Sequence, residues 1–278
     1  MSTENKRSSP ADEAVILSAA RTAIGKFQGG LSSIPAVKLG AVAVKAAVER
    51  AGIDPKEIEE VLMGNVVQAG NGQAPARQAA IFAGLPATVG ATAVNKVCGS
   101  GLKAAMMAAQ AVRAGDADLF VAGGMESMSR APYLVNGRSG ELKFGNQSLT
   151  DALLNDGLWD PFENWGMGNA AEFIADEYEV TREAMDEFAL RSHLKAVEAQ
   201  EAGMFSAEIV PVQIPGRKGE VTIFDKDEGP RKDTSLESLA KLKPAFKADG
   251  KVTAGNASSM NDGAAAIVIS SRAYAEKN

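Results

Sequence analysis

The sequence offers little for cross-linking or for binding metal, because one cysteine and one histidine occur among its 278 residues. A single cysteine excludes a disulfide within the chain, and this pair is too small a set for a structural zinc site. Aromatic residues contribute only 5%, which disfavours an aromatic-cored β-sandwich. No apolar run reaches the roughly 20 residues of a membrane-spanning helix, so we expect a soluble cytoplasmic protein.

Positive charge is also scarce, since 29 Lys and Arg against 35 Asp and Glu give a net charge of -6. Phosphate neutralisation requires a basic surface, so this balance argues against a general nucleic-acid binder, although a local basic patch could hold one small anion. Residues 1–13 carry both charge signs and lack the apolar h-region of a signal peptide, which predicts a disordered tail.

Glycine and alanine are abundant instead, and the 28 glycines favour closely packed α/β layers. Apolar runs predict strands, and helical spacing predicts helices between them. The predicted strands cover residues 14–19, 60–67, 92–97, 119–122 and 264–270, and the predicted helices cover residues 37–52, 75–84 and 98–113. Their alternation predicts an α/β fold with a mostly parallel sheet.

The helix predicted for residues 98–113 is apolar nearly all round, because only Lys103, Gln110 and Arg113 are clearly polar. A helix of this kind is buried on several sides. One sheet covers one side of a helix, so we expect another layer on the opposite side.

The alternation of strands and helices stops near residue 128. Loops rich in Gly and Asn then surround one amphipathic helix, residues 181–203, and one strand, residues 208–214. We therefore predict a core domain and an inserted loop domain. The core comprises residues 14–127 and 250–278, and the insertion comprises residues 128–249.

Cys98 directly follows a predicted strand and opens the next helix. The dipole and the unpaired N–H groups of a helix N-terminus stabilise the thiolate, which is the reactive form. Gly99 and Gly101 leave room for a thioester to approach the backbone. A lone cysteine before glycine is more often a small buried apolar residue, so the surrounding sequence has to decide between the two interpretations.

That surrounding sequence, residues 97–129, reads VCGSGLKAAMMAAQAVRAGDADLFVAGGMESMS. It resembles the nucleophile segment of the thiolases, followed by the Gly-Gly-Met-Glu-Ser-Met-Ser loop of that family. Three shorter stretches are similar to thiolases in the same order, namely residues 20–25 (ARTAIG), 73–78 (QAPARQ) and 252–264 (VTAGNASSMNDGA). The resemblance runs from about residue 14 to residue 271.

The resemblance implies a thiolase-type fold, of which this chain would form the N-terminal α/β half of five αβαβα layers together with the inserted domain. It also implies an acyltransferase of fatty acid metabolism with ping-pong chemistry. Cys98 would accept an acyl group from acetyl-CoA or a 3-ketoacyl-CoA and pass it to a second CoA species, and its backbone N–H would contribute to an oxyanion hole.

The resemblance further implies a coenzyme A site and no cofactor beyond coenzyme A as substrate. Arg231 would contact the nucleotide phosphate. The remaining contacts would be Ser238 and Phe246 in the neighbourhood of adenosine and pantetheine, Ala254 and Ser258 along the pantetheine arm, and Leu158 and Met167 in the same tunnel. Many thiolases carry a histidine immediately before the Met-Gly that corresponds to Met167-Gly168. This chain has Gly166 there, which weakens the expected contact.

The 278 residues contain no Gly-His-Pro and no Cys-Gly-Gly-Gly motif, in which thiolases carry their histidine base and second cysteine. His193 does not replace that base, because we expect it to face solvent on the helix of the insertion. Asp225 and Asp227 are expected in an acidic surface loop. We therefore expect this chain alone to be inactive and to require either self-association or a C-terminal thiolase half.

Three alternatives stay open at this point. A ketosynthase or hydroxymethylglutaryl-CoA synthase would share the nucleophile, although residues 124–128 (GMESM) and 256–258 (NAS) favour a thiolase. A non-catalytic CoA-binding protein would explain the missing base. A proteolytic fragment of a longer enzyme would explain it equally well.

Overall fold

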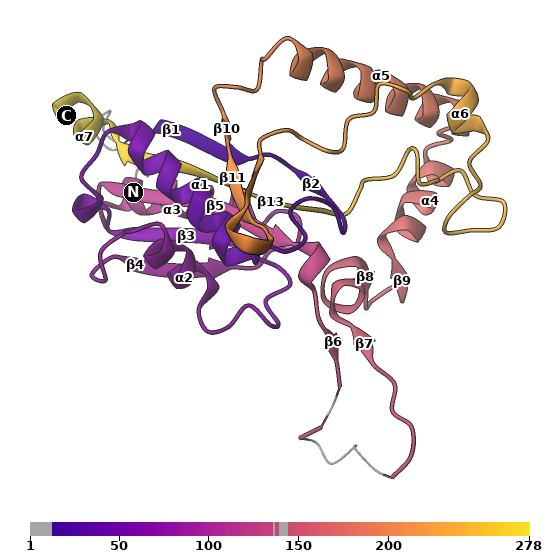
Figure 1. The fold of residues 1–278 in the computed structure, drawn as a ribbon, viewed down its shortest axis with the longest axis horizontal. Helices are drawn as coiled ribbons and strands as arrows, with labels where there is room; N and C mark the ends of the chain where they lie inside the picture. Colours follow the sequence, from indigo (N-terminus) through magenta and orange to yellow (C-terminus); the bar gives the residue numbers. More distant parts are fainter. Residues whose placement is uncertain (1–12, 136, 139–143) are drawn as a thin grey trace, which may run out of the picture.

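The computed structural model describes residues 13–135, 137–138 and 144–278. An α/β body lies at one side and an extended, mostly helical part at the other, with a narrow arm projecting from the body (Figure 1). The tail predicted for residues 1–13 lies outside the described residues except for Glu13. The Glu13 carboxylate pairs with Arg272 at 2.7 Å.

Seven strands of the described residues form one mixed sheet in the body, in the order β10-β1-β13-β5-β3-β4 with β2 paired to β13. The strands are β1 (Ala14–Thr22), β2 (Gly25–Lys26), β3 (Glu60–Gly64), β4 (Gly90–Val94), β5 (Leu119–Ser127), β10 (Ile209–Val210) and β13 (Asn261–Ser271). Six of these seven strands run in the same direction, as predicted for a mostly parallel sheet, and β13 runs antiparallel to its neighbours β1, β2 and β5. The inserted region returns the chain to the edge where β5 ends, so no helical crossover precedes β13.

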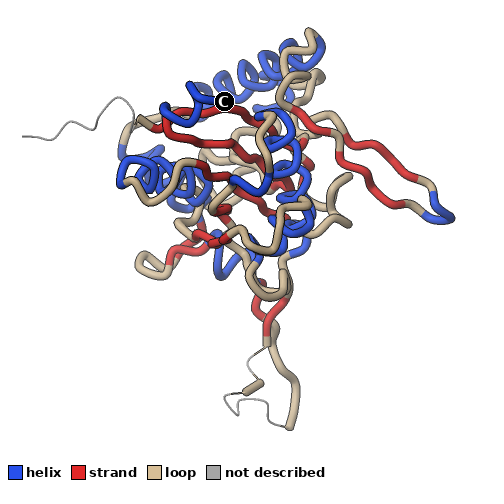
Figure 2. The backbone as a smooth tube through the Cα atoms, turned by 90° about the vertical axis from the view of Figure 1, so that its left-hand side faces the viewer, coloured by secondary structure: helices blue, strands red, loops and turns tan. Residues whose placement is uncertain are grey.

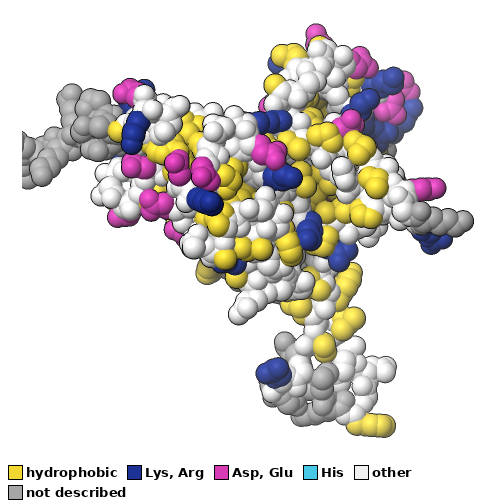
Figure 3. All heavy atoms as spheres, turned by 60° about the vertical axis from the view of Figure 1, so that its left-hand side comes forward, with side chains coloured by type: hydrophobic (Ala, Val, Ile, Leu, Met, Phe, Trp, Pro, Cys, Tyr) yellow, Lys and Arg dark blue, Asp and Glu magenta, His cyan; other side chains and the backbone are white. Residues whose placement is uncertain are grey.

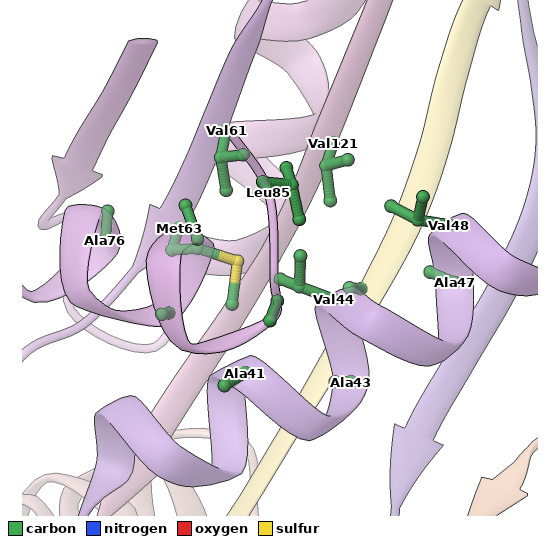
Figure 4. Close-up of a cluster of buried hydrophobic side chains, with 14 of the residues drawn as sticks. Ala41, Ala43, Val44, Ala47, Val48, Val61, Met63, Ala76, Leu85 and Val121 are labelled. Atoms are coloured by element: carbon green, nitrogen blue, oxygen red, sulfur yellow. The ribbon is translucent and has the colours of Figure 1, made fainter. Parts of the chain in front are cut away.

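Helices cover both faces of this sheet. On one face lie α1 (Ala36–Ala51) and α2 (Pro75–Phe82), and on the other lies α3 (Ser100–Ala114). Side chains along a strand alternate between faces, so Val121 of β5 packs toward α1 and α2 while Phe120 packs toward α3. Val44 and Val48 of α1 belong to the larger of these clusters (Figure 4).

The second face of α3 has no covering layer among the described residues. Ala104, Ala108 and Val112 are buried against the sheet, whereas Leu102 and Met106 on the opposite side are 70% and 49% exposed. Exposed hydrophobic side chains are also visible over the body and along the arm in the view of Figure 3. The sheet thus covers one side of a helix whose composition predicts burial on several.

The region from residue 128 to residue 260 contributes the arm, a hairpin and the helical part. Its elements are η3 (Met128–Arg130), β6 (Tyr133–Leu134), β7 (Thr150–Asp151), η4 (Leu153–Leu158), β8 (Trp159–Asp160), β9 (Trp165–Gly166), α4 (Met167–Glu177), α5 (Arg182–Glu201), β11 (Val212–Pro215), η5 (Arg217–Gly219), β12 (Val221–Phe224) and α6 (Leu236–Ala240). The hairpin β11–β12 projects from the molecule with η5 at its tip (Figure 2). Two short helices complete the body, η2 (Pro55–Glu57) and α7 (Arg272–Lys277).

Two predictions for this region need correction. The strand predicted over residues 208–214 is divided at Pro211, which has no N–H to donate, and its first part, β10, pairs with β1 of the core sheet. The helix α5 forms where predicted, but only Asp186 and Ala189 of it are buried, so its apolar residues do not form a buried stripe. Within the described ranges, no helix has both the length and the apolar content needed to span a bilayer.

Candidate active site

A cavity of about 470 Å³ opens where β1, β3 and β5 end and where β13 and α3 begin. The carboxyl ends of the strands in an open α/β sheet are a common place for ligands, because the connecting segments diverge there. Polar and reactive side chains in its wall are Arg21, Asn65, Cys98, Glu126 and Asp262. Cys98 is exposed and thus accessible from this cavity.

The turn before α3 holds Cys98 in a strained position. Val97 has a φ of 47°, a value that β-branched residues rarely adopt. Such strain persists only where surrounding contacts enforce it, and it concentrates at functional sites. Here the Ser100 hydroxyl enforces it, since Oγ accepts from the Lys96 N–H at 2.8 Å and donates to the Val97 carbonyl at 2.6 Å.

The relation of Cys98 to the helix differs from the expectation in two respects. The helix begins at Ser100 with Gly99 as its N-cap, so Cys98 precedes it. The N–H groups of Gly99 and Ser100 donate to the Lys96 and Val97 carbonyls, both at 3.1 Å, and are therefore not unpaired. These two donors stabilise the turn and are unavailable to an anion at the sulfur.

Gly64 allows α3 to pack closely on the sheet. A Cβ on Gly64, at the end of β3, would lie 2.7 Å from the backbone N of Gly101. The missing side chain lets the N-terminus of α3, and Cys98 before it, approach the end of β3 closely. Gly101 itself lines the cavity with Cys98, and a Cβ there would make only an ordinary contact, 3.6 Å from the Gly123 carbonyl oxygen.

Glu126 is a largely buried carboxylate in the cavity wall that sequence reasoning missed as a site residue. Oε2 accepts from the N–H groups of Val66 and Val67 at 2.8 and 3.3 Å, and Oε1 accepts from the Asn65 amide at 3.0 Å. Burial raises the pKa of Glu126, and these donors offset part of that rise. The carboxylate thereby fixes the loop after β3 to the end of β5.

Asp262 is a second buried acid at the cavity that the sequence did not single out. Its Oδ1 accepts from the Ser129 N–H at 3.0 Å and from the Ser127 hydroxyl at 3.3 Å. Its Oδ2 has no hydrogen-bond partner among the described residues. A usable signal was present for both acids, because each is a carboxylate embedded in the sequence of an apolar strand.

Arg21 connects the cavity wall to the inserted region. Its guanidinium makes two parallel contacts to Asp227, at 2.8 and 3.0 Å, and a third to Glu208 at 2.8 Å. The expectation of a solvated acidic loop is therefore wrong for Asp227, whose side chain is only 9% exposed. Burial would raise the pKa of Asp227, but the Arg21 side chain and the Ile24 N–H hold it below its usual value.

Of the seven residues predicted to contact coenzyme A, Leu158 lines the same cavity as Cys98. The other six lie outside its lining, on the neighbouring part formed by α4, α5, α6 and the loop before β13. Met167 begins α4, and Ser238 lies in α6. Arg231 and Phe246 lie in the loops that flank α6, and Ala254 and Ser258 lie in an exposed turn. The roles of all seven stay predictions.

Local contacts already engage two of these residues. The Ser238 hydroxyl and the Ser235 hydroxyl form a capping box at the start of α6. The Phe246 ring packs on Gly168, where a Cβ would approach it to 2.3 Å, so it lies beside Met167 at the start of α4. Gly168 therefore allows this contact.

Buried ionic groups hold the α4–α6 part together. The Glu172 carboxylate of α4 accepts from the Lys251 and Val252 N–H groups at 2.9 and 2.8 Å. Asp186 of α5 accepts from Arg182 at 2.7 Å and from the Asn256 amide at 2.9 Å. The bonds from Glu172 and Asp186 to residues 251–256 fix the turn that carries Ala254 and Ser258, and sequence reasoning missed them because they join segments 70 or more residues apart.

His193 occupies a different environment from the one expected. Its imidazole is half-buried, and Nδ1 accepts a hydrogen bond from the Arg231 N–H at 3.3 Å. The Arg231 side chain pairs with Asp233 at 3.2 Å, and both side chains are exposed. The sequence predicted a solvent-facing histidine on a helix, whereas the imidazole is half-buried. In the described part of the chain, no three His, Cys, Asp or Glu side chains gather as metal ligands.

Comparison with known proteins shows the family to which this chain belongs. Residues 14–273 match the family model described as "Thiolase, N-terminal domain". The chain belongs to the thiolase family. It is 56% identical over 265 residues to an acetyl-CoA acetyltransferase of Cupriavidus necator and 54% identical over 264 residues to one of Pseudomonas aeruginosa, covering 95% of this chain and 67% of each relative.

A solved thiolase structure shows that the likeness extends to the fold. The crystal structure of the Bacillus anthracis acetyl-CoA acetyltransferase matches with a TM-score of 0.92 and 41% identity, over 95% of this chain and 67% of that one. The thiolase-type α/β fold predicted from the motifs is confirmed. The chain thus spans about two thirds of the length of these thiolases.

Proposed function

We propose that this thiolase chain takes part in acyl transfer between CoA species through an acyl-enzyme on Cys98. The observation that carries the proposal is the exposed thiol on a strained turn in the wall of a 470 Å³ cavity. The family and the relatives named acetyl-CoA acetyltransferase support a thiolase reaction over that of a ketosynthase.

In thiolysis the Cys98 sulfur would attack the 3-keto carbon of a 3-ketoacyl-CoA. The bond between carbons 2 and 3 breaks, its electrons leave with acetyl-CoA, and carbon 2 takes a proton. The thiol of a second CoA then attacks the acyl-cysteine and releases acyl-CoA and the free thiol. Condensation of two acetyl-CoA molecules is the reverse.

In thiolases a histidine base and a second cysteine perform these proton transfers, and among the described residues the cavity wall holds no histidine and no cysteine besides Cys98. His193 lies on α5 and does not line it. We propose that the histidine base and second cysteine come from outside this sequence, and that they complete the site beside Cys98. Each transfer contributes roughly 10²- to 10⁴-fold, so we expect no measurable turnover of acetoacetyl-CoA by these 278 residues alone.

Coenzyme A would lie between the cavity and the α4–α6 part. Arg231 suits a phosphate contact, because its guanidinium is exposed and its present partner, Asp233, is equally accessible. Exposed ion pairs contribute only about 0–1 kcal/mol, so a phosphate can displace the Asp233 carboxylate at little cost. Leu158 in the cavity wall would contact the end of the ligand nearest Cys98.

The acyl-enzyme is tested by incubating the chain with acetyl-CoA and weighing the intact protein. We expect the mass of one acetyl group to be added, and proteolysis should place it on Cys98. Cys98→Ser, which replaces the thiol by a weaker nucleophile, should remain unmodified. Coenzyme A binding without any acylation would favour the second candidate, a non-catalytic CoA-binding half.

The phosphate contact is tested by calorimetry with CoA and dephospho-CoA, which lacks the ribose phosphate. Arg231→Ala should lower the affinity for CoA more than the affinity for dephospho-CoA. In the unsubstituted chain, added salt should reduce the difference between the two affinities. Arg217→Ala at the hairpin tip is the matched control and should change neither affinity. Equal losses for both ligands in Arg231→Ala would contradict the assignment of Arg231 to this phosphate.

A further inference from the structure

The hydrogen bond from the Arg231 N–H to His193 Nδ1 joins two segments that are 38 residues apart in sequence. Neither of the two is expected to meet the other from sequence, because His193 lies within the long helix α5 and Arg231 lies between β12 and α6. Nδ1 accepts this hydrogen bond only in the tautomer that carries its proton on Nε2.

The segment that carries Arg231 has few other anchors. It leaves the body after Glu228, whose N–H donates to the Ile24 carbonyl at 3.0 Å, and it ends at Ser235, the N-cap of α6. Between these points it forms no helix or strand. The His193 contact therefore fixes the Arg231 backbone against α5 near the middle of an irregular stretch.

The Arg231 side chain cannot fix the backbone in the same way. Its partner Asp233 belongs to the same segment, and their side chains are 67% and 71% exposed. A contact within one loop does not anchor that loop to a helix, and an exposed pair of this kind contributes little. If a phosphate replaces Asp233, the backbone bond to His193 persists, because it uses different atoms.

We infer that His193 is a positioning residue for Arg231 and holds its backbone so that the guanidinium is placed for the ribose phosphate of coenzyme A. This inference rests on the proposed role of Arg231 in binding that phosphate. Holding the loop in advance reduces the ordering that a ligand must impose when it binds. The contribution should appear only for ligands that carry the phosphate.

Two variants whose new side chains resemble each other in shape, His193→Leu and His193→Asn, test the acceptor atom. Asn and Leu side chains have nearly the same shape, and the Asn Oδ1 can occupy the place of the histidine Nδ1, whereas Leu has no acceptor. In His193→Leu we expect CoA affinity to fall about fivefold, the equivalent of one net hydrogen bond, with dephospho-CoA affinity unchanged. In His193→Asn we expect CoA affinity within about twofold of the unsubstituted chain, because the acceptor is restored.

The measurement is calorimetry with both ligands on four proteins: the unsubstituted chain, His193→Leu, His193→Asn and Arg231→Ala. Thermal unfolding of each confirms that α5 remains folded. If Arg231→Ala loses the preference for CoA but His193→Leu keeps it, the role of His193 is refuted and that of Arg231 stands. If Arg231→Ala keeps the preference, the proposed phosphate contact itself is refuted. Equal weakening of both ligands in His193→Leu, without rescue by Asn, would show a purely structural role.

Discussion

At the scale of single residues, buried carboxylates shape the cavity around Cys98 by accepting backbone N–H groups. Glu126 closes the loop after β3, and Asp262 closes the loop after β5. Both carboxylates are costly to bury, and their cost is offset by the donors that converge on them. Cys98 therefore lies in a frame held by acids that accept backbone N–H groups.

Glu126→Ala tests this frame. The change leaves the Asn65 amide and the N–H groups of Val66 and Val67 without their acceptor, and a buried unsatisfied group costs about 1–3 kcal/mol. We expect the free energy of unfolding, measured by urea titration, to fall by at least that amount. Glu163→Ala, an exposed glutamate in the inserted region, is the control and should change it by less than about 0.5 kcal/mol.

The free energies of unfolding of the unsubstituted chain and of Glu126→Ala should depend differently on pH. Burial raises the pKa of Glu126 above 4.5 in the folded chain. The carboxyl then contributes fully to stability below pH 4.5, and part of its contribution disappears as the pH rises through the raised value. The stability difference between the unsubstituted chain and Glu126→Ala should shrink over that rise, and a difference that grows instead would contradict the burial argument.

At the scale of elements, Arg21 ties the end of β1 to the region after β12. Through Asp227 the guanidinium joins the core sheet to the inserted region. It also contacts the segment before β10, where it pairs with Glu208 and lies 5.3 Å from the centre of the Phe205 ring. One side chain of the sheet thus fixes two segments of the insertion. β10 adds a direct strand pairing between the same two parts.

Asp227→Asn should loosen this junction. The uncharged amide keeps the size of the side chain but loses the ion pair, and we expect unfolding to cost about 1–3 kcal/mol less at neutral pH. Asp227 has a lowered pKa, so its contribution is present above its usual value of 3.8 and is lost as the pH falls through the lower folded value. Acid titration should therefore destabilise the unsubstituted chain more than the variant. Asp225→Asn, two residues away and exposed, is the matched control.

At the scale of the whole molecule, α3 lacks a cover on its outer face among the described residues. Leu102 and Met106 are exposed there one helical turn apart. Proteins that remain monomeric rarely expose large contiguous apolar patches, so such a face favours association with another surface. The thiolase relatives are longer than this chain, which covers 67% of them.

Leu102→Gln combined with Met106→Gln tests whether this face drives association. We expect the unsubstituted chain to sediment as a mixture that grows with concentration, and we expect the double variant to shift toward the monomer. The polar side chains reduce the apolar area available for burial, which contributes about 25 cal/mol per Å². Met204→Gln, at an exposed methionine after α5, should not alter the distribution. A strictly monomeric unsubstituted chain would contradict the prediction.

The sequence alone determined the family and the strand–helix pattern, because these depend on local composition and on contiguous motifs. The helix after Cys98 and its apolar faces could be predicted from residue spacing. Strands 14–19 and 264–270 were predicted close to their observed places in β1 and β13. Their antiparallel pairing was not predicted, because the direction of β13 depends on how the inserted region returns the chain to the sheet.

Only the tertiary structure decided which side chains meet. Arg21 and Asp227 are 206 residues apart, and His193 and Arg231 are 38 apart, so no local pattern predicts either contact. Periodicity and motifs report what a segment prefers by itself. A hydrogen bond or an ion pair between distant segments depends on geometry that appears only when the sheet, the helices and the insertion are packed together.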